Sequence, residues 1–93
     1  MLKIIVCVKD NVAEVFHDPH IEVNTASAIR SFTQSAQDQV HKDDFSLYQI
    51  GSYNTDNGQI IANEPLRIFS GHDIKPDNVV DLPENLKKQS GAN

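Results

Sequence analysis

The chain has 93 residues, of which 39% are hydrophobic, and its 13 acidic and 8 basic residues give a formal net charge of −5. This length is that of one small domain, and no apolar run approaches the roughly 18 residues of a membrane-spanning helix. The acidic balance argues against strong nonspecific binding of nucleic acid, although a local basic patch would remain compatible with it. The only cysteine, Cys7, cannot form an internal disulfide, which is typical of a reducing cytosol.

The first quarter of the chain predicts two antiparallel strands. Residues 2–9 are rich in β-branched side chains and alternate between a fully apolar face and a mixed face, as expected for a sheet covered on one side. The mixed face consists of Lys3, Ile5, Cys7 and Lys9. A turn signal follows at residues 10–11, and residues 12–16 form either a short strand or an irregular bend. Residues 20–23 predict a second strand, antiparallel to the first.

An amphipathic helix is predicted over residues 25–39. Asn24 or Thr25 is a suitable N-cap, because a short side-chain oxygen can accept a hydrogen bond from a free amide of the first turn. Apolar side chains then recur at helical spacing and form one narrow stripe. The stripe consists of Ala28, Ile29, Phe32, Ala36 and Val40.

The next segment predicts a β-hairpin. Residues 45–53 alternate as a strand, the pair Asn57-Gly58 favours a tight turn, and residues 59–62 return as a second strand. Pro65 is expected to end that strand, because proline cannot donate a hydrogen bond to a neighbouring strand. Residues 66–69 are expected to form a short apolar turn packed on the sheet edge.

These elements predict an α+β fold in ββαββ order, with a mainly antiparallel sheet and one amphipathic helix packed on one face. Residues 1–71 would form a single domain, and residues 72–93 a polar, flexible C-terminal tail. Because a domain of this size buries only a small core, a homodimer or higher homo-oligomer is expected.

Catalysis is not indicated by any motif. His17 and His20 flank Asp18-Pro19 and could supply metal ligands, but exposed imidazoles in a turn are the better interpretation, because no further ligand pair has a suitable spacing. Cys7 lies in the middle of a predicted strand, where a packed thiol is more common than a nucleophile. We therefore expect no enzyme activity, no metal and no cofactor.

Single-strand binders combine exposed aromatic side chains with a basic groove. Tyr48 and Tyr53 lie on opposite faces of their predicted strand if its alternation is regular, so one of them would point outward. Arg30, Lys42 and Arg67 are the candidate phosphate contacts. The alternative interpretation places the phenylalanines in the core and both tyrosines at its rim.

Four motifs, in this order, resemble the small nonstructural protein of gokushoviruses, the icosahedral single-stranded DNA phages of the Microviridae. The motifs are Val15-Phe16-His17-Asp18-Pro19, Ala28-Ile29-Arg30-Ser31-Phe32, Asp44-Phe45-Ser46-Leu47-Tyr48-Gln49-Ile50-Gly51 and Asp56-Asn57-Gly58. The resemblance covers residues 1–62 and is specific as an ordered set rather than motif by motif.

The resemblance implies a non-enzymatic accessory protein in the host bacterial cytoplasm, acting in single-stranded DNA genome synthesis or packaging. Direct binding of single-stranded DNA is one expected mode of action. The alternative is an interaction module that modulates a phage or host replication protein without binding DNA. In that case Leu82 and Leu86 of the tail would contact the partner.

Overall fold

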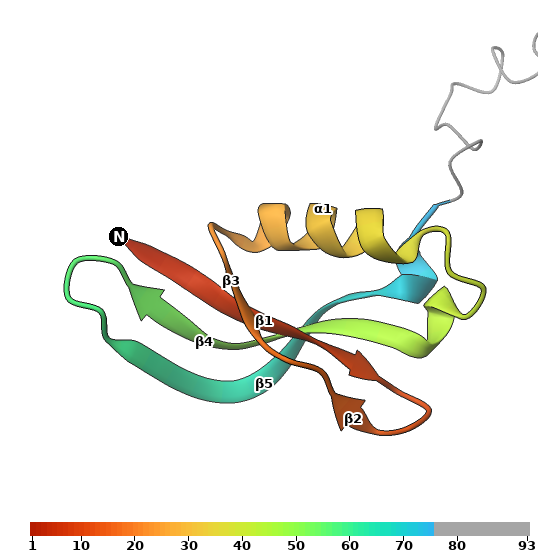
Figure 1. Ribbon diagram of the computed structural model, residues 1–93, viewed down its shortest axis with the longest axis horizontal. Coiled ribbons are helices and arrows are strands. Elements are labelled where there is room, and N and C mark those ends of the chain that lie inside the picture. Colours follow the sequence, from red (N-terminus) through yellow and green to blue (C-terminus); the bar gives the residue numbers. More distant parts are fainter. Residues whose placement is uncertain (76–93) are drawn as a thin grey trace, which may run out of the picture.

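The computed structural model describes residues 1–75 and has one helix lying across one face of a five-stranded sheet (Figure 1). The elements are β1 (Leu2–Asp10), β2 (Val15–Phe16), β3 (His20–Glu22), α1 (Thr25–Ala36), η1 (Lys42–Asp44), β4 (Phe45–Asn54), β5 (Ile60–Ser70) and η2 (Gly71–Asp73), where η is a 3-10 helix. This arrangement confirms the expected α+β fold. None of the helices within residues 1–75 is long and apolar enough to cross a membrane.

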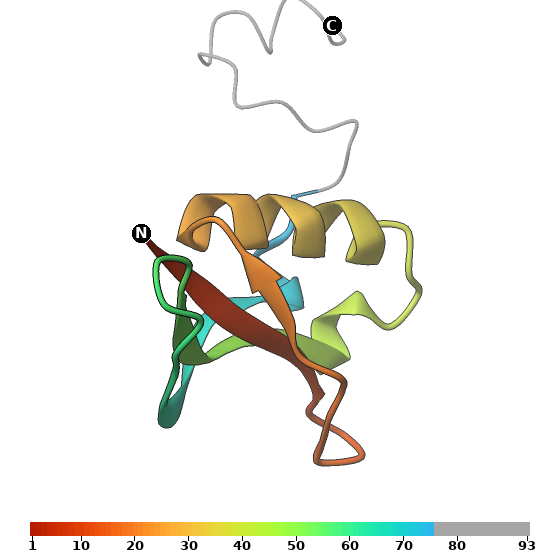
Figure 2. The same ribbon diagram turned by 60° about the vertical axis from the view of Figure 1, so that its left-hand side comes forward.

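Strand β1 lies at the centre of the sheet. Its first edge pairs with both β2 and β3, and its other edge pairs with β4, which in turn pairs with β5; every pairing is antiparallel. The chain bends between β2 and β3 at residues 17–19, so these two short strands share one edge of β1. In both ribbon views the β1–β2 turn and the first part of β5 lie on the side away from α1, whereas the β4–β5 turn curves back toward the helix side (Figures 1 and 2).

The helix begins as predicted but is shorter than predicted. The Asn24 side chain caps it by accepting a hydrogen bond from the Ser27 amide at 2.8 Å. The helix ends at Ala36, where the Gln39 amide donates to the Ala36 carbonyl in a tight turn. Val40, the expected last member of the apolar stripe, therefore lies beyond the helix and is 89% exposed.

The core lies between α1 and the sheet face that it covers. Its buried residues come from the helix, from β1 and β4, and from the segment after η2. They are Val6, Ala28, Phe32, Ala36, Leu47 and Ile74. Phe32 meets Phe69 edge-to-face with ring centroids 6.0 Å apart. Most of the expected tail, residues 76–93, lies outside the described residues.

Strand β5 is longer than predicted, because Pro65 does not end it. The pairing with β4 passes from Gly51↔Ala62 to Gln49↔Leu66, so residues 63–65 form a bulge that requires no regular hydrogen bonds from the proline. β5 is also an edge strand, where proline is tolerated. Residues 66–69 are consequently part of the strand, and the prediction of a separate turn there was wrong.

A second bulge decides which side chains of β4 share a face. Ile5 pairs with Gly51 but Val6 pairs with Gln49, so Ile50 is an extra residue in β4. The bulge shifts the alternation by one, and Tyr48 and Tyr53 therefore lie on the same face. The prediction that they occupy opposite faces was wrong, because it assumed an unbroken alternation. At this point β4 approaches β5 so closely that a Cβ on Gly51 would lie 2.5 Å from the Ile61 carbonyl oxygen.

Candidate nucleic-acid interface

The sheet face turned away from α1 is called the open face here. In β1 it contains the mixed set predicted from the sequence, and cross-strand pairing extends it over the neighbouring strands. Its members are Lys3, Ile5, Cys7, Lys9, Phe16, Ile21, Ser46, Tyr48, Gly51, Tyr53, Ile60, Ala62, Arg67 and Ser70. No Asp or Glu within residues 1–75 occupies a paired position on this face.

One end of the open face carries a compact cluster of aromatic and basic side chains. Phe16 of β2 meets Tyr48 of β4 edge-to-face, with ring centroids 5.2 Å apart and an interplanar angle of 80°. The Lys9 ammonium lies 5.3 Å from the Phe16 ring centroid and 5.8 Å from that of Tyr48. Cation–π attraction of this kind favours the conformation in which the Lys9 ammonium stays close to both rings. Phe16 remains 42% exposed, so a flat apolar ligand has access to the cluster.

Two more basic side chains extend this arrangement. Arg67 pairs across the sheet with Tyr48, and Lys3 pairs with Tyr53 near the other end. Directly paired side chains have Cβ atoms about 5 Å apart, so each tyrosine has a cation as its neighbour. Lys3 and Lys9 are six residues apart on β1, which corresponds to about 20 Å along the strand.

The three cations of the open face, Lys3, Lys9 and Arg67, form no ion pair with any carboxylate of residues 1–75. Six of the eight basic residues lie in that part of the chain, since only Lys87 and Lys88 follow it, and half of the six are on this face. The open face is therefore basic and aromatic even though the chain as a whole is acidic.

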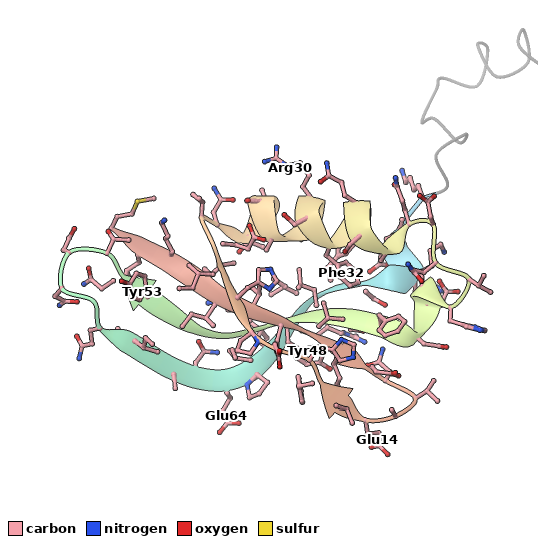
Figure 3. The ribbon with its side chains drawn as sticks, in the orientation of Figure 1. Glu14, Arg30, Phe32, Tyr48, Tyr53 and Glu64 are labelled. Carbon is pink, nitrogen blue, oxygen red and sulfur yellow. The ribbon has the colours of Figure 1, made fainter. Side chains whose placement is uncertain are left out.

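The structure brings together three of the five residues that the sequence suggested for nucleic-acid binding, namely Tyr48, Tyr53 and Arg67. Arg30 lies on α1 and points away from the sheet (Figure 3). Lys42 lies in η1, where its ammonium pairs with the Asp43 carboxylate at 3.1 Å. The two suggested partner-binding residues, Leu82 and Leu86, lie outside the described residues.

Three members of the face were missed as candidates: Lys3, Lys9 and Phe16. The alternation of residues 2–9 already placed both lysines on the mixed face, so their shared orientation was available from the sequence. The position of Phe16 was not, because it depends on how the irregular turn after β1 directs β2 against Lys9.

Comparison with known protein families matches residues 3–74 to the family described as Phage ORF5 protein. The chain belongs to this phage family. The matched region contains all of β1 except its first residue and extends to the last core residue, Ile74. No curated protein and no solved structure matches the chain. The family match thus identifies a bacteriophage protein, and the chemistry of its site rests on the geometry above.

The thiol of this phage protein is shielded. Cys7 belongs to the open face by its register, but it is only 2% exposed. Burial raises the pKa of the Cys7 thiol above its ordinary value, because the charged thiolate is poorly solvated there. The population of reactive thiolate near neutral pH is correspondingly small.

The histidines His17 and His20 lie on the helix side of the sheet and not on the open face. His17 lines a cavity of about 230 Å³ between the C-terminal half of α1 and the sheet, beside Val8 and Phe45. His20 lines a smaller neighbouring cavity of about 140 Å³, and its Nε2 lies 3.1 Å from the Glu22 carboxylate. No group of three or more metal-ligating side chains occurs within residues 1–75.

Proposed function

We propose that this phage protein is a non-enzymatic accessory protein that binds single-stranded DNA through its open face. Its task would be in the synthesis or packaging of a single-stranded DNA genome in the host bacterial cytoplasm, as the resemblance to the gokushovirus nonstructural protein suggests. The observation that carries the proposal is that three cations, which form no ion pair within residues 1–75, share one sheet face with three accessible or half-buried aromatic rings, and that no Asp or Glu of those residues holds a paired position on it.

The aromatic rings favour a single strand as the ligand. Bases that are not already stacked in a duplex can stack on Tyr48, Phe16 or Tyr53, and such stacking tolerates any sequence because every base has a π-face. Lys9 holds the Phe16–Tyr48 pair from one side and is itself available to a phosphate. The cation beside each ring could form an ion pair with the phosphate of the nucleotide whose base stacks on that ring.

The charges favour a nucleic acid over an acidic peptide or a small anion. Lys3, Lys9 and Arg67 are distributed along about 20 Å of sheet rather than converging on one point. A polyanion with regularly repeated charges fits this spacing, and its binding releases counterions along its length.

Replacing Tyr48 tests the proposal. We expect Tyr48→Leu to lower the affinity for a fluorescent oligothymidine of about 12 nucleotides by at least fivefold, since base–aromatic stacking contributes about 1–3 kcal/mol. Tyr48→Phe keeps the ring and should retain most of the affinity. Fluorescence anisotropy measures binding, and circular dichroism verifies that each variant is folded.

Unchanged affinity in Tyr48→Leu would remove the open face from the binding site. The same conclusion would follow if Tyr48→Phe lost as much affinity as Tyr48→Leu, because the hydroxyl and not the ring would then matter. Absence of any DNA binding by the folded wild-type protein would refute the proposed function itself.

A second function is favoured by a different observation. The N-terminus and β5 expose several large apolar side chains on both faces of the sheet, with Ile60 on the open face and Leu2, Ile61 and Leu66 on the other. Exposed apolar surface of this kind is typical of protein contacts. Under this alternative the protein modulates a phage or host replication protein without binding DNA, and the same surface would serve the expected homo-oligomer.

A further inference from the structure

Two carboxylates stand at opposite edges of the open face. Glu14 lies in the turn between β1 and β2, and Glu64 lies in the bulge of β5; both are exposed. Figure 3 shows both side chains on the side of the sheet away from α1, which is the side of the open face. Since β2 and β5 are the outer strands of the order β2-β1-β4-β5, Glu14 stands at the β2 corner of the face, near the end that carries Lys9 and Phe16, and Glu64 stands at its β5 edge.

We infer that Glu14 and Glu64 are specificity-determining residues that exclude duplex DNA and leave a path for a single strand. This inference rests on the proposed function and adds the choice between the two forms of DNA. Neither carboxylate forms an ion pair with another side chain of residues 1–75, so both retain their charge for repulsion of phosphates.

The width of the open face leaves room for one DNA backbone between the edge carboxylates but not for two. Four neighbouring strands at about 4.8 Å spacing give a face about 14 Å wide, with its cations on β1 and β5. A single strand fits between the edges, with its phosphates near the cations and its bases near the rings. A duplex holds its two backbones about 12 Å apart across the major groove. If one backbone follows the cations of β1, the other is therefore brought to an edge of the face.

The curvature of the sheet strengthens this effect. The β1–β2 turn and the distal part of β5 project away from α1, so the edges extend toward the ligand (Figure 2). Asp18, in the exposed bend between β2 and β3, adds a further negative charge along the β2 edge. The backbone of Glu14 has φ of 60°, a left-handed conformation that fixes where this side chain leaves the turn.

The test compares two double variants that remove the same charge. Glu14→Gln with Glu64→Gln neutralises the edges of the open face, and Asp38→Asn with Asp73→Asn neutralises two exposed carboxylates outside it. Anisotropy titrations use a fluorescent oligothymidine and a duplex of equal length at about 50 mM salt, where surface charges are weakly screened. Gln and Glu have the same backbone requirements, so the strained turn is retained.

We expect the edge variant to bind the duplex about fivefold more tightly than the wild type and the single strand less than twofold more tightly. The control variant should change both affinities by the same small factor. An edge variant that gains equally for both forms of DNA, or that behaves like the control, would overturn the inference while single-strand binding by the wild type would still support the proposed function. A wild-type protein that binds neither form would refute the proposed function and the inference with it.

Discussion

The salt dependence of DNA binding gives the sharpest quantitative prediction, because the open face presents a defined number of cations. Lys3, Lys9 and Arg67 form no ion pair with carboxylates of residues 1–75, so each is free to displace a counterion from a phosphate. For a single strand the logarithm of the binding constant falls by about 0.7 per phosphate contact for each decade of salt. Three contacts therefore predict a slope of about −2.1.

With a slope of about −2.1, raising the salt concentration from about 50 to about 200 mM should lower the affinity of the wild type about 18-fold. A variant with one cation fewer has a slope of about −1.4 and should lose about 7-fold. Lys9→Met is the best single variant, because methionine retains an apolar stem that can still pack over Phe16 and Tyr48. Arg30→Met removes the same charge from the outer side of α1 and should keep the wild-type slope (Figure 3).

Fluorescence anisotropy titrations at four salt concentrations measure these slopes, with the protein and probe otherwise unchanged. Equal slopes for Lys9→Met and Arg30→Met, both shallower than the wild type, would mean that net charge rather than the open face governs binding. A slope unchanged in Lys9→Met would show that Lys9 contacts no phosphate. Either result would refute the assignment of the open face as the path of the DNA backbone.

Three further predictions concern the fold that presents this face. Glu14→Gly should stabilise the protein by about 0.5–1 kcal/mol in urea unfolding, because glycine adopts the observed φ of 60° without strain; a loss of stability would contradict this. Asn24→Ala should cost about 1 kcal/mol in the same assay and Asn24→Gly only a few tenths, whereas equal losses would show that the cap hydrogen bond is unimportant. A thiol reagent should label Cys7 much more slowly in the folded than in the urea-unfolded protein, with the folded rate rising only above the ordinary thiol pKa; equal rates would contradict its burial.

The sequence predicted the elements whose signals are local. The alternation in β1, the Asn24 cap, the helical stripe as far as Ala36 and the Asn57-Gly58 turn each depend on neighbours within a few residues, and each appears in the structure. Gly58 adopts a φ of 76°, as the turn requires. The α+β class follows from these elements because an amphipathic helix and a half-apolar sheet must cover each other.

What the sequence did not reveal depends on pairing between distant strands. The bulges at Ile50 and at residues 63–65 are set by how β4 fits against β1 and β5, and no local pattern marks them. The first places Tyr48 and Tyr53 on one face, and the second carries β5 through Pro65, so that Arg67 pairs with Tyr48. A third bulge, at Ile68, separates the pairs Leu47↔Phe69 and Tyr48↔Arg67, so that Arg67 and Phe69 lie on opposite faces of β5. These non-local irregularities thus assemble the candidate interface from side chains that regular alternation would have separated.

The net charge of the chain does not report the charge of its open face. The formal net charge of −5 includes carboxylates that stabilise local structure. Asp10 accepts hydrogen bonds from two turn amides, Glu22 binds Ser27 and His20, and Asp56 pairs with the N-terminal amine. These side chains are directed into turns or toward α1 and contribute little charge to the middle of the open face. A phosphate approaching the middle of that face would meet the cations first, whereas the carboxylates of Glu14 and Glu64 stand at its edges. An acidic protein can therefore present a basic and aromatic face, and under the proposed function the carboxylates at the edges of that face would make it selective for a single strand.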